Sequence, residues 1–228
     1  MRTTPLENTD VREAITTRRS FRAFLDKPVP ESTLRSILDV ARFSPSSTNM
    51  QPWQVFVLQG EKKKQLDEAL LTAFDEGRPA APHMSSYLNN WFEPFKSRRF
   101  GCGTALYDAL KIERQDKEGR RAQARNNFNA FGARTVFIFG MNHKLNEGSV
   151  FDCGMFYHAV MLAAMAEGLE TCPEASLIGW PDLLKELLDV DDSWKFLSGM
   201  AIGYADYQHP VNRYQTERVE VDEFCKFY

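Results

Sequence analysis

The sequence predicts one folded domain that combines α-helices with a few β-strands. The chain has 228 residues, 43% apolar and 26% charged, which suits a single sizeable core. Several segments repeat apolar residues at helical spacing, whereas three short apolar runs, 54–60, 133–141 and 198–206, are typical of strands. No repeat, low-complexity tract or linker divides the chain, so we expect residues 1–228 to form one domain.

The first third of the chain predicts three helices, a polar loop and a strand. A helix is expected to start at Thr9–Asp10, where capping side chains precede apolar residues at helical spacing. Residues 29–43 predict a second helix with Pro30 at its beginning. The loop 44–53 leads into the strand 54–60, and residues 60–74 predict the third helix.

The remainder predicts a long apolar helix between two strands. Residues 77–131 contain several short helical stretches and a charged run that suits a solvated helix or loop. The segment 149–169 predicts a helix that is apolar nearly all round, and so buried in a core or an interface. A short helix from Pro181 and the strand 198–206 follow, and the tail 207–228 has no strong periodicity.

Composition makes a cytoplasmic protein the expectation. The N-terminus lacks the apolar stretch of a secretory signal, and the most hydrophobic segment, 154–166, is too short to cross a bilayer. The four cysteines are widely spaced, so we expect reduced thiols and no zinc site. No histidine spacing indicates a catalytic metal, and no serine has a hydrolase motif around it.

A basic motif near the N-terminus stands out against this background. The stretch TTRRSFRAF, residues 16–24, places Arg18, Arg19 and Arg22 within five residues, although the net charge is −3. In an extended chain Arg18, Ser20 and Arg22 would share one face, with Arg19 on the other. Two guanidinium groups flanking a hydroxyl suit a phosphate or a planar polar ring. An exposed basic turn explains the motif equally well, whereas the acidic balance disfavours a nucleic-acid partner.

A polar loop follows some 25 residues later. The stretch PSSTNMQPW, residues 45–53, combines prolines, hydroxyls and amides beside a tryptophan. Such groups can meet the edges of a planar heterocycle, although a loop without a ligand is the alternative.

Together the two segments, RRSFRAF and PSSTNMQPWQVFVL, resemble the flavin-dependent nitroreductase family, in particular its nitrobenzoate-reductase-like branch. Three further stretches follow in the family's order: GLETCPEAS, in which TCPEA predicts a turn, then the strand GMAIGYAD and the tail ERVEVDEF. The resemblance implies an α+β fold, a mostly antiparallel sheet surrounded by helices in an intertwined homodimer with two FMN sites.

The resemblance also implies cofactor-binding residues. Arg18 and Ser20 match positions on the FMN phosphate and ribityl chain, with Arg19 beside them, and Arg22 matches a position near the pyrimidine edge. Arg218 matches a phosphate-binding arginine, but Thr216 stands where many members carry a second basic residue. The partner subunit's loop would supply Pro45, Ser46, Ser47, Asn49 and Gln51. The turn packed on the flavin ring would be Pro173, Glu174 and Ala175, with the Ala175 N–H orienting N5.

The sequence itself is consistent with a phosphate held by arginines. It contains no G-x-x-x-x-G-K-[ST] loop and no G-x-G-x-x-G after a strand, so a backbone phosphate cradle of these kinds is missing. If the arginines replace that cradle, three lie near the start of the chain and Arg218 lies far behind them.

The activity implied is two-electron transfer from NADH or NADPH to an electron-poor acceptor, such as a nitroaromatic or quinone, by a ping-pong mechanism without a catalytic side chain. The same scaffold also serves dehalogenation, ring oxidation and flavin destruction, and a non-enzymatic flavin-binding redox sensor is a further alternative. Residues 77–131 would be a variable helical insert or lid, and 207–228 an extension contacting the partner. We expect no nucleic-acid or membrane partner and no metal.

Overall fold

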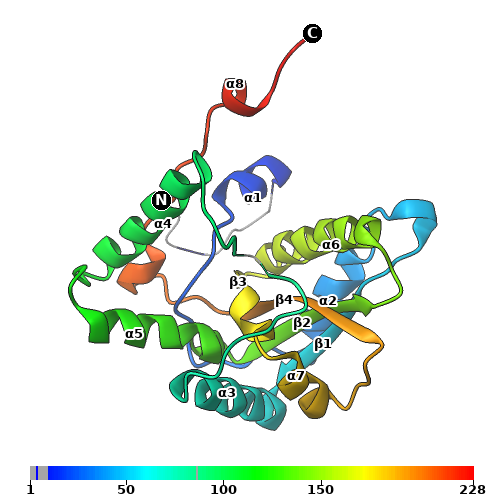
Figure 1. The fold of residues 1–228 in the computed structure, drawn as a ribbon. Helices are drawn as coiled ribbons and strands as arrows, with labels where there is room; N and C mark the ends of the chain where they lie inside the picture. The colour runs from blue at the N-terminus through cyan, green and yellow to red at the C-terminus, as the bar shows by residue number, and fades with distance from the viewer. Residues whose placement is uncertain (1–3, 5–9, 86) are drawn as a thin grey trace.

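A computed structural model describes Thr4 and residues 10–85 and 87–228. Its centre is a four-stranded sheet with the order β1-β2-β4-β3, in which every neighbouring pair is antiparallel (Figure 1). The strands are β1 (Gln54–Gln59), β2 (Thr135–Asn142), β3 (Glu170–Glu174) and β4 (Trp194–Gly203). The expected α+β class with an antiparallel sheet is therefore confirmed.

Helices surround this sheet (Figure 1). The α-helices are α1 (Val11–Thr17), α2 (Glu31–Ala41), α3 (Gly60–Asp75), α4 (Phe95–Ala109), α5 (Lys117–Arg125), α6 (Glu147–Ala166), α7 (Pro181–Leu188) and α8 (Val221–Phe224). Short 3₁₀ turns occur at η1 (Ser47–Asn49), η2 (Asn126–Gly132), η3 (Ala175–Ile178) and η4 (Pro210–Asn212). Asp10 caps α1 by accepting from the N–H groups of Arg12 and Glu13, and Thr9, the other predicted cap, lies outside the described residues.

Alternation along the strands divides the core into two layers. Val136 and Ile138 of β2 belong to the cluster formed with α3, η2 and α7. Phe137 and Phe139, which point the other way, belong to the cluster formed with α2 and α6. The sheet is therefore covered on both faces, which explains why β2 is apolar at nearly every position.

Helix α6 is the central helix of one layer. It has 20 residues, against 13 in the apolar segment 154–166, so by length and composition it could cross a membrane. Half of the apolar window is buried within the protein, where α6 packs against α2 and the sheet. The prediction of a buried helix is confirmed for that half.

Two segments differ from the sequence-based expectation. The turn expected at TCPEA is part of strand β3, which pairs with β4 from Glu170 opposite Gly203 to Glu174 opposite Gly199. Two glutamates and a proline in five residues hide it, and Pro173 is tolerated because β3 lies at the edge of the sheet. The region 77–131 contains a 15-residue helix, α4, rather than only short helical stretches.

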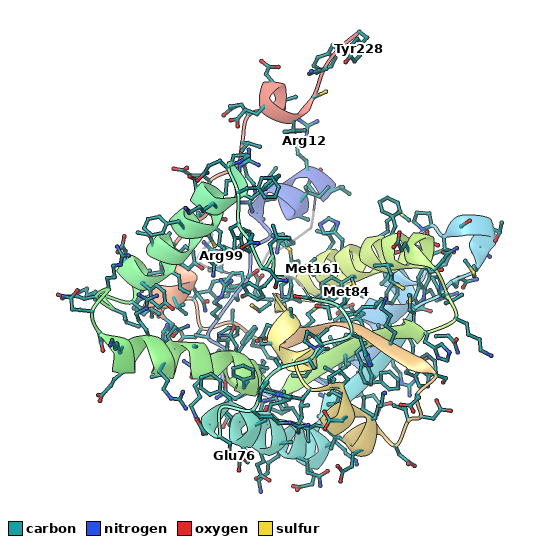
Figure 2. The ribbon with its side chains drawn as sticks, viewed as in Figure 1. Arg12, Glu76, Met84, Arg99, Met161 and Tyr228 are labelled. Atoms are coloured by element: carbon teal, nitrogen blue, oxygen red, sulfur yellow. The ribbon has the colours of Figure 1, made fainter. Side chains whose placement is uncertain are left out.

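The segment before β1 and the tail extend this framework. Residues 21–25 run beside β3 and the end of β4, with the Phe21 N–H donating to Thr171 O and the Leu25 N–H to Tyr204 O. Beyond α8 the C-terminal arm ends at Tyr228, which lies away from the body of the protein (Figure 2). An ion pair of 3.4 Å between Arg98 and Glu223 connects α4 to α8.

Candidate functional site

A cavity of about 660 Å³ lies where the N-terminal arginines meet α4 and the C-terminal segment. Arg18, Arg19, Ser20 and Arg22 line it together with Arg218, so residues almost 200 positions apart in sequence share one cavity. The remaining lining residues are Ile15, Thr16, Thr17, Cys102, Tyr214, Gln215 and Thr216. Its volume lies in the range typical of small-molecule sites.

The alternation predicted for the basic motif holds for Arg19 and Phe21. The Arg19 guanidinium lies over the Phe21 ring, 4.9 Å from its centroid, so these two side chains share one side of the segment. Phe21 is fully buried beneath the segment. Arg19 also contributes to the lining of the cavity beside Arg18.

The electrostatics of the cavity favour an anion. The pKa of Arg18 is lowered, first because the guanidinium is partly buried and second because the charge of Arg218 acts on it. The pKa of His158 on α6 is also lowered, first by partial burial and second by the charge of Arg18. Among the described residues that line the cavity, none is acidic. A phosphate placed here would offset this repulsion, so these residues fit the phosphate end of FMN.

Arg22 lies deeper and is held in place. Its Nη1 donates to Tyr214 Oη at 2.8 Å, and its backbone N–H donates to Asn212 Oδ1 at 2.7 Å. The Arg22 charge also acts on Glu174, a residue that is 4% exposed and whose two carboxyl oxygens have no hydrogen-bond partner among the described residues. Burial raises the pKa of Glu174 well above its ordinary value, so the protonated form is favoured.

The predicted turn Pro173–Ala175 lies at the end of β3 and does not line the cavity. Tyr157 of α6 reaches this end of the sheet and donates to Gly199 O at 2.6 Å. Gly199 is required there, because a Cβ would lie 2.6 Å from Leu177 Cβ of η3. The turn after β3 therefore packs tightly on β4, which fixes the position of Ala175.

The predicted loop Pro45–Gln51 also lies outside this cavity. The Ser47 N–H donates to Asp152 Oδ2 at 3.1 Å, and the Gln51 N–H donates to Ser46 Oγ at 3.0 Å. Thr48, Asn49 and Gln51 have φ values of 50°, 57° and 51°, a strained conformation for residues with a side chain. The loop is thus a largely exposed element that is held by hydrogen bonds to Asp152 and within itself, and it lies outside its own chain's arginine cavity.

Six residues of the cavity were not predicted from the sequence: Ile15, Thr16, Thr17, Cys102, Tyr214 and Gln215. Tyr214 comes from the aperiodic tail and Cys102 from α4, in the region that gave no clear pattern. The spacing Tyr214–Thr216–Arg218 was the available signal, since alternate residues of an extended segment can face one side.

Comparison with known proteins supports a family assignment. A model of the nitroreductase family matches residues 15–204. The chain is 34% identical to 4-nitrobenzoate reductase of Pseudomonas putida over 218 residues, covering 96% of this chain and 95% of the relative. It is 36% identical to chloronitrobenzene nitroreductase of Comamonas testosteroni over 217 residues, covering 94% and 95%.

Solved structures share the fold. The FMN and NADPH-dependent nitroreductase NfnB from sphigopyxis sp. strain HMH superimposes with a TM-score of 0.93 at 36% identity, covering 96% of this chain and 99% of that one. The FMN-dependent nitroreductase NfnB from Mycobacterium smegmatis, solved with NADPH, gives 0.90 at 31% identity, covering 95% and 97%. With the fold, the order of the motifs and these matches in agreement, the chain belongs to the nitroreductase family.

Proposed function

We propose that this protein is an FMN-dependent oxidoreductase that moves two electrons from NADH or NADPH to an electron-poor acceptor such as a nitroaromatic or a quinone. The observation that carries the proposal is the cavity, where Arg18, Arg19, Arg22 and Arg218 converge on the nitroreductase fold. When bound, FMN would supply the two-electron chemistry.

The residues of the cavity divide into two groups under this proposal. Arg18, Arg19 and Arg218 would hold the phosphate, and Ser20 the ribityl chain, through charge-assisted and neutral hydrogen bonds. The deeper Arg22 would face the pyrimidine edge, where a fixed positive charge stabilises negative charge on the ring. The backbone N–H of Ala175 would orient N5, with Pro173 and Glu174 packed beside the ring.

A homodimer would complete the site. Ser46, Ser47, Asn49 and Gln51, with Pro45, would reach the flavin of the partner subunit, which accounts for an ordered polar loop outside its own chain's cavity. Large apolar side chains are exposed around this loop and on α6: Phe43 by 76%, Val40 by 62% and Phe151 by 71%. Apolar surface of this kind is typical of a protein interface.

The outer segments would vary the activity. We propose one domain of residues 1–228, in which 77–131 form a variable helical insert or lid and 207–228 an extension toward the partner. Every residue of α4 is at least partly exposed, and Phe224 and Phe227 of the arm are exposed by 70% and 83%. We place the protein in the cytoplasm, with a small-molecule acceptor as its other partner.

The visible spectrum of the purified protein tests this proposal. We expect the absorption of oxidised FMN, bleaching on anaerobic addition of NADPH or NADH, and recovery on addition of a nitrobenzoate. A colourless protein that does not take up added FMN would refute the cofactor. A yellow protein that no nicotinamide bleaches would indicate a flavin-binding sensor instead.

A further inference from the structure

A buried amide fastens the C-terminal segment to the arginine motif. Asn212, which is 2% exposed, accepts from the Arg22 N–H at 2.7 Å. Its Nδ2 donates to Ala23 O and to Asp206 O, both at 2.8 Å. The Asn212 side chain thus makes three hydrogen bonds that fix residues 206–212 against residues 22–23. The segment 206–212 lies beyond residue 204, where the match to the family model ends.

Two positions later the same segment reaches the Arg22 side chain. Tyr214 Oη accepts from Arg22 Nη1 at 2.8 Å, and both side chains line the cavity. The same Nη1 lies 3.4 Å from Ser20 O, so this end of the guanidinium is held from two sides. Burial is the main cause that raises the pKa of Tyr214, which keeps the phenol neutral at physiological pH.

A neutral phenol can hold the Arg22 guanidinium in one orientation without cancelling its positive charge. A carboxylate partner would neutralise Arg22, whereas a hydroxyl accepts one of its five N–H groups and leaves the charge intact. The Tyr214 O–H also keeps its own proton, which can be donated to an acceptor in the cavity. Pre-oriented donors of this kind need no reorganisation when negative charge forms on a ligand.

We propose that Tyr214, fastened by Asn212, is a positioning residue that fixes the Arg22 guanidinium and thereby strengthens binding of reduced over oxidised FMN. The inference rests on the proposed function, because it takes FMN as the occupant of the cavity. Reduction adds electron density to the ring, so the affinity for the reduced form should depend on a fixed Arg22 more strongly than the affinity for the oxidised form.

The test compares the wild type with Tyr214→Phe, which removes only the hydroxyl oxygen. Apoprotein is titrated with oxidised FMN, and the reduction potential of the bound FMN is measured against a reference dye. We expect the dissociation constant for oxidised FMN to stay within about threefold. The affinity for reduced FMN should fall about tenfold further, which lowers the two-electron potential by about 30 mV. An unchanged potential in Tyr214→Phe would overturn the inference.

Two controls separate positioning from general damage. Tyr207→Phe removes a hydroxyl of the same segment that donates to Glu170 Oε1 at 2.6 Å and does not line the cavity. It should lower the melting temperature without shifting the potential, and a shift equal to that of Tyr214→Phe would contradict a specific role. In an Arg22→Gln background, Tyr214→Phe should produce no further shift, because the tyrosine acts through the arginine. Wild-type apoprotein that binds no FMN would instead overturn the proposed function and this inference with it.

Discussion

Arg18 is the residue on which the affinity of the cavity should depend most directly. Its charge is partly buried and faces that of Arg218, so an anion between them gains from both. We expect Arg18→Ala to weaken FMN binding by about 10- to 150-fold, the loss of a charge-assisted hydrogen bond worth roughly 1.5–3 kcal/mol. Titration calorimetry with FMN measures this. Arg42→Ala, which removes the same charge from an exposed ion pair with Asp39, is the matched control and should leave the affinity unchanged.

Glu174 predicts an unusual dependence of stability on pH. Its folded pKa lies above the unfolded value, so its stabilising contribution is complete below about pH 4.5 and is lost as the pH rises. Glu174→Gln removes the ionisable group and should stabilise the apoprotein by about 1–3 kcal/mol at pH 8, but little at pH 4.5.

Urea unfolding of both apoproteins across this pH range measures the difference. The matched control is Glu76→Gln at the exposed end of α3, labelled in Figure 2, which should leave the profile unchanged. If Glu174→Gln and the wild type lose stability in parallel as the pH rises, the carboxyl group is not held protonated.

Residue chemistry in the sequence predicts a basic group of Arg18, Arg19 and Arg22, whereas Arg218 was added only through the family resemblance and the partners of these arginines were not predicted. The fold brings Arg218 to the other three. Tyr214 could have been inferred only from its spacing to Thr216 and Arg218, and Asn212 has no such signal in the aperiodic tail. Their contacts arise only when the tail folds back over residues 20–23.

At the scale of elements, the loop after α2 stores strain that a single substitution can release. Thr48 is β-branched and has φ 50°, in the left-handed region that asparagine tolerates better. We expect Thr48→Asn to stabilise the protein by about 0.5–1 kcal/mol. Urea denaturation measures the change, with Thr72→Asn on the exposed side of α3 as the control. A destabilised Thr48→Asn would mean that the threonine hydroxyl matters more than the backbone strain.

Helices and strands could be predicted from the spacing of apolar residues wherever that spacing is regular. The helices α2, α3, α6 and α7 and the strands β1, β2 and β4 lie where the sequence predicts them, with ends shifted by a few residues. Strand β3 could not be predicted, because its burial comes from pairing with β4 rather than from its own hydrophobicity. The helix α4 carries almost no amphipathic pattern, so neither its length nor its place beside the cavity was visible.

For the whole molecule, the exposed apolar surface predicts association. Phe151 protrudes from α6, on the layer of the sheet that α2 and α6 cover. Light scattering should show a dimer for the wild type, and Phe151→Glu should weaken it by more than about 100-fold, because a carboxylate would enter an apolar contact.

The dimer and the cofactor should be linked, because a loop from each chain would complete the other's site. FMN should therefore stabilise the wild-type dimer by mass action. Thr72→Glu adds the same charge on α3, on the opposite layer, and should remain dimeric. A wild-type monomer that holds stoichiometric FMN would refute the shared site.

The kinetic pattern should report on how many sites the molecule offers to its two substrates. The sequence contains no separate dinucleotide fingerprint, so NAD(P)H and the acceptor are expected to use one place in turn. Reciprocal rates against NAD(P)H, at several fixed concentrations of a nitroaromatic, should then give parallel lines. High concentrations of the acceptor should inhibit competitively against NAD(P)H.

The polar loop supplies the variant that sharpens this kinetic test. Asn49→Ala or Gln51→Ala, if these amides reach the partner's flavin, should slow the reaction with NAD(P)H and leave the lines parallel, because the order of events is unchanged. Thr72→Ala, distant on α3, should alter neither rate nor pattern. Lines that converge to the left of the axis would require both substrates to be bound together. The molecule would then need two separate substrate sites, and sequential use of one site would be excluded.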